Sequence, residues 1–197
     1  MEQSDTKTQI VDTAIELFWK TSYHATNMND LSREVGINKA TVYQHFRSKE
    51  AIAIASVARG AERTVDYVFE GAFQEYDLPL ERLHEIHRRI YETHRAIFEQ
   101  TATCRGCPFV NIGTELATIS EPIRLAVVAA FRRFAPYYRC IVEDLAASGA
   151  LKQNIETDQL VADLQDNMNA ALVASKIEKR PEAILETAER AVRYLTT

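Results

Sequence analysis

The sequence predicts an all-α protein in which a small N-terminal helix-turn-helix domain is joined to a larger helical domain. Apolar residues recur at three- and four-residue spacing along most of the 197 residues. The interruptions coincide with Gly, Pro and helix-capping residues, and no segment has the alternating pattern of a strand. We expect residues 1–50 to form the first domain and residues 51–197 the second.

The first helix is predicted from Ile10, Ala14 and Phe18, which share one helical face. Ser, Asp and Thr at positions 4–6 are its candidate capping residues. The pattern ends near Thr21, so we expect the helix to end there.

Two shorter helices are predicted next. Asn27, with Asp30 three residues later, resembles a capping box at the start of the second helix. Gly36 supplies the left-handed residue that ends this helix. Asn38 then caps a third helix that runs to Phe46.

Longer helices are expected in the rest of the chain. Ser48 caps one of them, and Pro79 and Pro181 mark breaks because proline cannot continue a helix. Ser120 caps another, which stops at Gly149. The expected helices are 49–76, a helix from Pro79 to about 101, 110–119, 121–148, 157–177 and 182–195, with a loop at 102–108 and a connection at 150–156.

The charge distribution argues against a protein that coats nucleic acid nonspecifically, because the net charge is −5. Residues 1–60 are neutral overall, and the acidic excess lies in residues 61–197. Residues 38–49 contain Lys39, Arg47 and Lys49 but no acid. A local basic face on an acidic chain suits a dimer that grips DNA at two points.

Several classes of protein are not expected from the composition. No apolar run approaches about 20 residues, so we predict no membrane span. The polar, acidic N-terminus is unlike a signal peptide, which favours a cytoplasmic protein. Three cysteines are an odd number, so reduced thiols are expected in place of disulfides. No pattern indicates a cofactor or a metal.

The third predicted helix carries the groups that suit a DNA major groove. Thr41 and Gln44 can meet base edges, and Ala40 can contact a thymine methyl group. Contacts with DNA phosphates are expected from polar and positively charged side chains on this helix and just after it. These are Lys39, Tyr43, His45 and Lys49. The alternative is an ordinary helical hairpin in which Tyr43 serves only for packing.

Residues 22–49 resemble the tetracycline-repressor (TetR) family of bacterial regulators. The similarity lies in Ser22-Tyr23, Thr26, Asp30-Leu31-Ser32, Val35-Gly36-Ile37 and Tyr43-Gln-His-Phe-Arg-Ser-Lys49. Ser22 and Ser32 depart from the usual glycine and alanine. The resemblance implies a homodimeric repressor of a palindromic operator, with Thr26 among the DNA-binding residues and an unknown small-molecule effector. It also implies that the helices near 157–177 and 182–195 pair with their symmetry mates.

A second segment, from Cys104 to Glu115, contains a Cys-x-x-Cys sequence. A zinc site would need two further ligands, and a thioredoxin-like site would need a βαβ unit. The remaining functional interpretation is a sensor thiol, because Cys107 precedes a helix and Arg105 is nearby. The alternative is that Cys104 and Cys107 are packed, inert thiols.

The spacing of Cys107, Asn111, Glu115 and Lys176 resembles an electrophile-responsive branch of the family, which includes the N-ethylmaleimide reductase repressor. The resemblance implies that Cys107 is a redox switch with Lys176 near it. The candidate effector residues are Cys107, Cys104, Lys176, Tyr91, Phe98, Asn111 and Tyr137, and His87, His94, Phe109, Tyr138 and Asn167 are also expected to face inward, although the histidines could equally be exposed.

Two other functions are compatible with the sequence. One is an all-α thiol enzyme, peroxidase-like, that uses Cys107, although no His-carboxylate pair lies in the same loop. The other is a helical adaptor without a role on DNA. The leading hypothesis is a regulator that an effector or a thiol modification releases from its operator.

Overall fold

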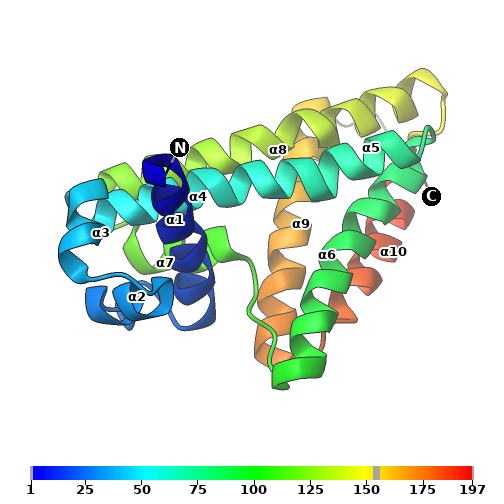
Figure 1. The fold of residues 1–197 in the computed structure, drawn as a ribbon. Helices are drawn as coiled ribbons and strands as arrows, with labels where there is room; N and C mark the ends of the chain where they lie inside the picture. Colours follow the sequence, from blue (N-terminus) through cyan, green and yellow to red (C-terminus); the bar gives the residue numbers. More distant parts are fainter. Residues whose placement is uncertain (1, 153–155, 197) are drawn as a thin grey trace. The chain divides into compact units, whose positions relative to one another are not determined.

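The computed structural model describes residues 2–152 and 156–196, and every regular element in those ranges is helical (Figure 1). The all-α fold class is therefore confirmed. The elements are α1 (Glu2–Lys20), α2 (Met28–Val35), α3 (Lys39–His45), α4 (Lys49–Thr64), η1 (Val65–Glu70), α5 (Gly71–Glu75), α6 (Pro79–Thr101), α7 (Pro108–Leu116), α8 (Glu121–Ala147), α9 (Thr157–Glu178) and α10 (Ala183–Thr196).

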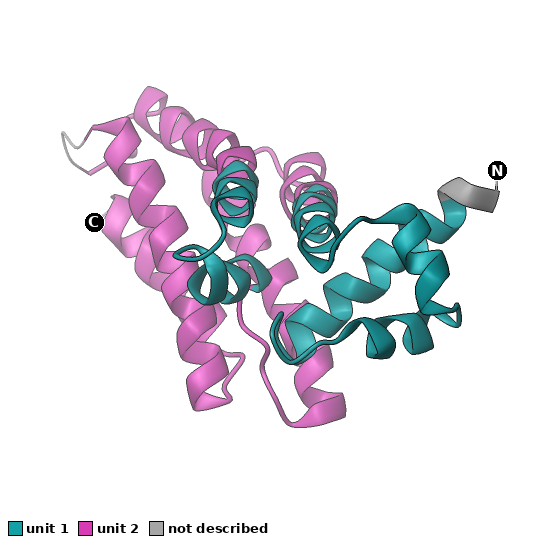
Figure 2. Cartoon of the chain, turned by 90° about the vertical axis from the view of Figure 1, so that its left-hand side faces the viewer, with its two compact units in different colours: residues 1–62, 108–131 teal, residues 63–107, 132–197 magenta. Residues whose placement is uncertain are grey.

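Packing divides the chain into two compact units, which Figure 2 colours separately. Unit 1 contains residues 1–62 and 108–131, and unit 2 contains residues 63–107 and 132–197. Unit 1 therefore joins the N-terminal helices to α7 and the first part of α8. The boundary expected at residue 50 separates a helix-turn-helix domain from a larger helical domain. This division by role stays a prediction.

Capping explains the short helices of unit 1. The Asn27 side chain accepts hydrogen bonds from the amides of Asn29 and Asp30, each 2.9 Å away. Gly36 adopts a φ of 79°, a conformation that favours glycine, and so ends α2. The Asn38 side chain accepts the Thr41 amide at 2.8 Å and so starts α3. These three predictions are confirmed.

The cap predicted at positions 4–6 is wrong, because α1 already begins at Glu2. Helices as short as α2 and α3 are unstable alone, so packing has to hold them. Their anchors Leu31 and Val42 are fully buried, as are Ile10 of α1 and Ile52 of α4. Each such side chain contributes about 1.5–3 kcal/mol on burial.

The helix expected over 49–76 is interrupted by a π-helix. Its residues Val65–Glu70 separate α4 from α5. A π-helix holds an extra residue in a turn, and such turns occur mostly as short insertions in α-helices at functional sites. Apolar periodicity did not reveal it, because Val65, Val68 and Phe69 are also buried at spacings that an α-helix would allow.

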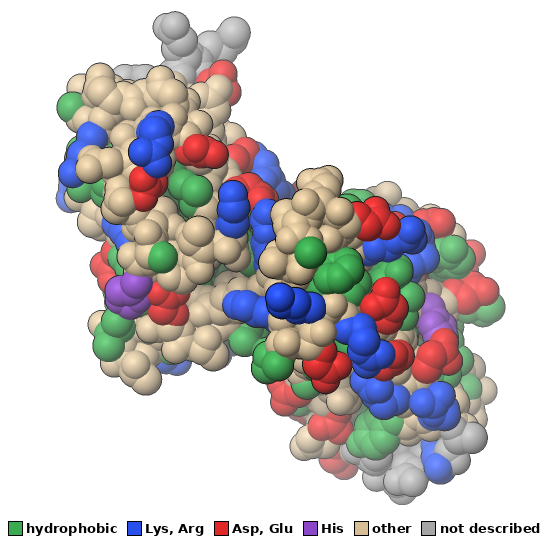
Figure 3. Space-filling model, turned by 90° about the horizontal axis from the view of Figure 1, so that it is seen from below, with side chains coloured by type: hydrophobic (Ala, Val, Ile, Leu, Met, Phe, Trp, Pro, Cys, Tyr) green, Lys and Arg blue, Asp and Glu red, His purple; other side chains and the backbone are tan. Residues whose placement is uncertain are grey.

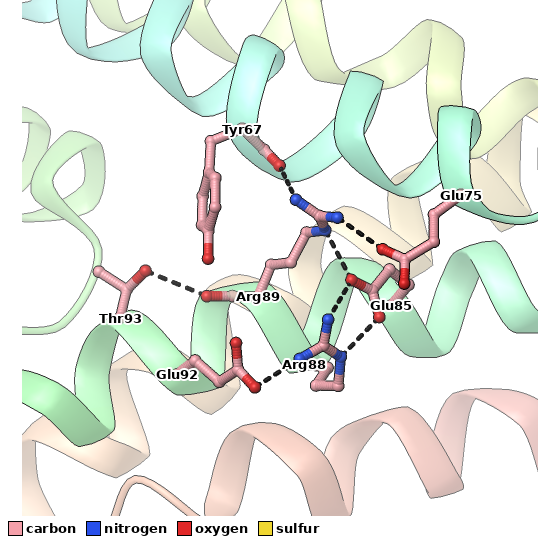
Figure 4. Close-up of polar contacts among 7 residues, drawn as sticks. All are labelled: Tyr67, Glu75, Glu85, Arg88, Arg89, Glu92 and Thr93. Atoms are coloured by element: carbon pink, nitrogen blue, oxygen red, sulfur yellow. Dashed lines mark hydrogen bonds and ion pairs between the residues drawn. The ribbon is translucent and has the colours of Figure 1, made fainter.

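A network of charged side chains lies beside the π-helix in unit 2 (Figure 4). Glu85 of α6 is only 3% exposed and receives hydrogen bonds from both Arg88 and Arg89. Arg89 also donates to the backbone oxygen of Tyr67, at 2.9 Å, and to the Glu75 carboxylate, at 2.7 Å. Burial raises the pKa of Glu85, but the two arginines outweigh it, so the net pKa is lowered.

Within unit 2, α10 packs against both α6 and α9 (Figure 1). The helices predicted at 157–177 and 182–195 agree with α9 and α10 to within a residue at either end. The connection predicted at 150–156 includes residues 153–155, which lie outside the described ranges. No helix in the described ranges has the length and hydropathy that a membrane crossing requires.

Candidate nucleic-acid interface

The turn before α2 is built by hydroxyl groups. Thr26 donates to the Ser22 carbonyl at 2.8 Å, and its hydroxyl lies 3.0 Å from that of Thr21. The Ser22 hydroxyl accepts the amide of Ala25 at 3.2 Å. Thr26 is buried, so its hydroxyl stabilises the turn. A DNA contact through Thr26 stays a prediction, and this burial does not favour it.

The α3 helix presents a polar face on an apolar base. Val42 is fully buried and Phe46 nearly so, which fixes one side of the helix. The opposite side exposes the residues predicted to meet DNA. Lys39, Ala40, Tyr43 and Gln44 are exposed, and Thr41 and His45 are half-buried. These residues of α3 therefore point away from the apolar base of the helix.

Two cations of the interface rest on tyrosine rings. The Lys39 amine lies 6.0 Å from the centroid of the Tyr43 ring. The Lys49 amine lies 4.1 Å from the centroid of the Tyr23 ring, a short cation–π contact. Burial lowers the pKa of Lys49, and the nearby Glu115 acts in the opposite direction. Lys49 is thus half-buried against the turn, whereas Lys39 is exposed.

Glu115 of α7 makes a contact that the sequence did not predict. Its carboxylate accepts the backbone amides of Tyr23, at 3.0 Å, and His24, at 2.7 Å. It also lies 2.6 Å from Nδ1 of His24. The partners are about ninety residues apart in the chain, so no local pattern could have revealed the contact.

The charge pattern of the surface is mixed. On the face that Figure 3 shows, acidic and basic side chains are interspersed. The chain as a whole has a net charge of −5. DNA binding therefore has to depend on local groups such as Lys39 and Arg47, which are exposed.

Cys104 and Cys107 lie at the end of the first stretch of unit 2, which contains residues 63–107. Cys104 and Cys107 are both buried and not joined by a disulfide. Burial raises the pKa of Cys104, and Glu182 raises it further, so this thiol is kept protonated. Lys176 lies against the segment, because a Cβ atom on Gly106 would be 3.1 Å from the Lys176 Cδ. Gly106 also has a φ of 68°, which favours glycine.

The other candidate effector residues are distributed over both units. Tyr91, Phe98 and Tyr137 belong to unit 2 and are half-buried, whereas Asn111 belongs to unit 1. The Tyr137 hydroxyl donates to Glu70, and burial together with this carboxylate raises the pKa of Tyr137 to about 12. The inward orientation predicted for Asn167 is wrong, because this side chain is exposed.

Two buried histidines lie on one face of α6. His87 Nδ1 is 2.8 Å from the Leu83 carbonyl and therefore donates to it. Burial lowers the pKa of His87 to about 4. Burial and the charge of Arg105 lower the pKa of His94 to about 4 as well. Both rings are thus neutral at pH 7, and no metal-binding cluster of side chains occurs among the described residues.

Two family models match the chain. The model described as "Bacterial regulatory proteins, tetR family" covers residues 10–55. The model described as "Tetracyclin repressor-like, C-terminal domain" covers residues 79–192. The first contains the helix-turn-helix of unit 1, and the second covers more than half of the chain.

Curated relatives resemble the chain over nearly its full length. The uncharacterised HTH-type transcriptional regulator YxaF of Bacillus subtilis is 25% identical over 189 residues, which are 95% of this chain and 94% of that protein. The HTH-type transcriptional repressor DhaR of a Mycobacterium species is 23% identical and covers 93% of this chain and 89% of its own. The reduced form of Escherichia coli NemR has the same fold, with a TM-score of 0.78 at 18% identity over 98% of both chains.

Proposed function

The chain belongs to the tetR family of bacterial regulatory proteins, and we propose that it is a repressor whose helix-turn-helix binds a palindromic operator in the cytoplasm. The exposed polar face of α3 carries this proposal, because Asn38 caps the helix and Val42 fixes its back. A helix held in this way can present its side chains to the major groove in one orientation.

The residues of this face divide into two roles. We expect Ala40, Thr41 and Gln44 to contact base edges, since amide and hydroxyl groups pair with bases and a methyl group packs on thymine. Lys39, Tyr43, His45 and Lys49 lie where phosphate contacts are expected. The hydroxyl of Thr41 already donates to Asn38 at 3.0 Å, which fixes its rotamer.

A homodimer through α9 and α10 is the expected assembly, because regulators of this family bind operator DNA as dimers. Apolar side chains on these helices are exposed in the single chain. Ile177 is 76% exposed and Val173 is 40% exposed, both on α9. An exposed apolar surface of this kind is typical of a protein interface. The Ile177→Glu variant places a charge on this surface and should reduce dimerisation. Ile119→Glu in unit 1 is the matched control, because Ile119 is also an exposed isoleucine.

Release from DNA is expected to start in unit 2. Cys107 and the lysine stem beside Gly106 support a thiol-based effector response, and the half-buried aromatic residues Tyr91 and Phe98 support a small-molecule response. The dimer binds DNA only when its two recognition helices lie about 34 Å apart. The thiol modification or the small molecule would therefore act by favouring a state of the dimer with a different spacing of these helices. The proteins that match the chain are regulators, so we propose regulation without turnover of a substrate.

The experiment is a mobility shift of a duplex that the wild-type protein selects from a random pool. Gln44→Ala should lower affinity for that duplex by about 1–3 kcal/mol and relax the sequence preference at one position. Addition of N-ethylmaleimide then separates the two effector hypotheses. If the reagent releases the wild type but not Cys107→Ser, Cys107 is the switch. If it releases neither, the thiol hypothesis is wrong and a small-molecule effector remains.

A further inference from the structure

Glu115 of α7 supplies the hydrogen-bond acceptors that the turn between α1 and α2 lacks. The Thr21 amide donates to the Leu17 carbonyl of α1, and the amides of Ala25 and Thr26 donate to oxygen atoms of Ser22. The amides of Tyr23 and His24 instead donate to Glu115. The Tyr23 contact is half-buried, and an amide without an acceptor there would cost free energy, whereas the His24 contact is exposed. The carboxylate is therefore part of the structure of the turn at Tyr23.

The two carboxylate oxygens take separate donors. Oε2 of Glu115 accepts the Tyr23 amide at 3.0 Å, and Oε1 accepts the His24 amide at 2.7 Å. His24 Nδ1, at 2.6 Å from Oε1, must donate as well, because an ionised carboxylate can only accept. Hydrogen bonds to a charged acceptor are roughly twice as strong as neutral ones, and two successive amides fix the direction of the backbone.

Glu115 remains ionised in this position. Its side chain is 22% exposed, and that burial raises its pKa. The hydrogen bonds from His24 and Tyr23 outweigh burial and lower the net pKa. The charge-assisted contact is therefore present at neutral pH.

The contact extends from the turn to the start of α4. The Tyr23 ring lies 5.5 Å from the ring of Phe18 and carries the Lys49 amine on its face. Lys49 is the first residue of α4, and the next residue, Glu50, accepts the hydroxyl of Ser120 at 2.6 Å. The segment from α7 to the start of α8 thus holds the helix-turn-helix at two places, both within unit 1.

We propose that Glu115 is a positioning residue for DNA binding, which acts through the turn at Tyr23 and His24 and not by touching DNA. This role rests on the proposed binding of an operator by α3. The turn ends at the Asn27 cap, and α2 packs against both α1 and α3. A shift of the turn is therefore passed to α3, and the range of about 2.7–3.2 Å for a hydrogen bond leaves little tolerance at base edges.

The position of Glu115 also suggests how unit 2 can act on DNA binding. Glu115 lies on α7, and the first residue of α7, Pro108, directly follows Cys107, the last residue of that part of unit 2. A helix of nine residues is a rigid connection between that point and the turn. A change at Cys107 would therefore act on the residue that directly precedes the helix of Glu115.

The test compares Glu115→Gln, which keeps an acceptor oxygen, with Glu115→Leu, which keeps similar volume but no acceptor. Affinity is measured for the duplex that the wild-type protein selects from a random pool. We expect Glu115→Leu to lower affinity on the order of 10- to 100-fold and Glu115→Gln to lie between it and the wild type. Glu121→Leu is the matched control, because it removes the same charge from an exposed site in unit 1.

Amide hydrogen exchange provides a readout that a purely packing role would not change. In Glu115→Leu, exchange should accelerate at Tyr23 and His24, while amides of the buried part of α4 stay protected. Equal affinities of Glu115→Gln and Glu115→Leu, or unchanged exchange at the two amides, would overturn the positioning role alone. A wild-type protein that selects no duplex would overturn both this role and operator binding.

Discussion

The caps of α2 and α3 in unit 1 and the charged network of unit 2 are formed over different distances along the chain. In unit 1, Asn27 and Asn38 satisfy amides within three residues of themselves. In unit 2, Arg89 joins Glu85 to the backbone of Tyr67, which lies 22 residues away. Local caps can be recognised in a sequence, and they define the DNA-binding helices. Distant and buried charges cannot, and because of them we expect unit 2 to respond more strongly than unit 1 to pH and to substitution.

The largest difference between the units is expected from acid. The pKa of His87 and of His94 is lowered to about 4 by burial, whereas an unfolded histidine titrates near 6.5. At a pH between about 6.5 and 4, the two histidines of the unfolded state bind protons, whereas the same histidines of the native state stay neutral. Stability is therefore complete above about pH 6.5 and is lost as the pH falls toward 4, by on the order of 3 kcal/mol for each histidine.

Chemical denaturation at a series of pH values measures this loss. The His87→Leu variant should show a shallower dependence between pH 6.5 and 4, because one of the two buried rings is gone. A free energy of unfolding that stays constant over this range in the wild type would contradict the prediction.

The next largest effect is expected at Glu85. The Glu85→Ala variant removes the buried carboxylate and leaves Arg89, whose side chain is 16% exposed, with only part of its partners. Breaking a buried ion pair in this way costs about 3–5 kcal/mol. The matched control is Glu99→Ala, which removes an exposed partner of Arg95 and should cost at most about 1 kcal/mol. Similar losses in the two variants, measured by urea denaturation, would contradict the distinction.

Two helical glycines, one in each unit, provide a closer comparison. A Cβ atom on Gly71 would lie 2.8 Å from the guanidinium carbon of Arg89, so Gly71→Ala should displace Arg89 from the Tyr67 carbonyl. A Cβ atom on Gly60 would meet the Phe109 ring at 3.6 Å, an ordinary contact. We expect Gly60→Ala to stabilise unit 1 by up to about 1 kcal/mol and Gly71→Ala to destabilise unit 2 by a similar amount. Thermal unfolding of both variants would show whether the signs differ.

The smallest effect is expected from a single cap. Asn27→Ala removes the acceptor for the amides of Asn29 and Asp30 and should cost about 1 kcal/mol. Asn29→Ala, at an exposed position inside α2, should change stability by a few tenths of a kcal/mol at most. If the two alanine variants unfold at the same denaturant concentration, the cap does not stabilise α2.

The predicted parts of the fold are those that depend on neighbours in sequence. Apolar periodicity predicted the helices, Asn27 and Gly36 predicted where α2 begins and ends, and Asn38 predicted where α3 begins. The polar residues expected to contact DNA lie on the side of α3 opposite the buried Val42 and Phe46. Each of these inferences needs only the geometry of one helix.

The parts that were missed depend on partners far away in sequence or on small changes of helix geometry. The π-helix was read as part of one α-helix, because its buried residues follow a spacing that either helix allows. The Glu115 contact joins residues 92 positions apart, and the burial of Thr26 follows from a turn that the sequence did not specify. The exposure of Asn167 shows that a periodic pattern leaves the face of a single polar residue undecided.

A stripe of buried residues with a regular interval runs from α4 into the π-helix. Ala53, Val57, Ala61, Val65 and Phe69 are all buried and are spaced by four residues throughout. In an α-helix each such step advances by about 40°, so the stripe winds around the helix instead of following one side. A wider turn reduces this winding. Because a π-turn holds one extra residue, removal of one residue from Val65–Glu70 would leave an α-helical turn, so that the later side chains would keep their directions while the segment becomes shorter.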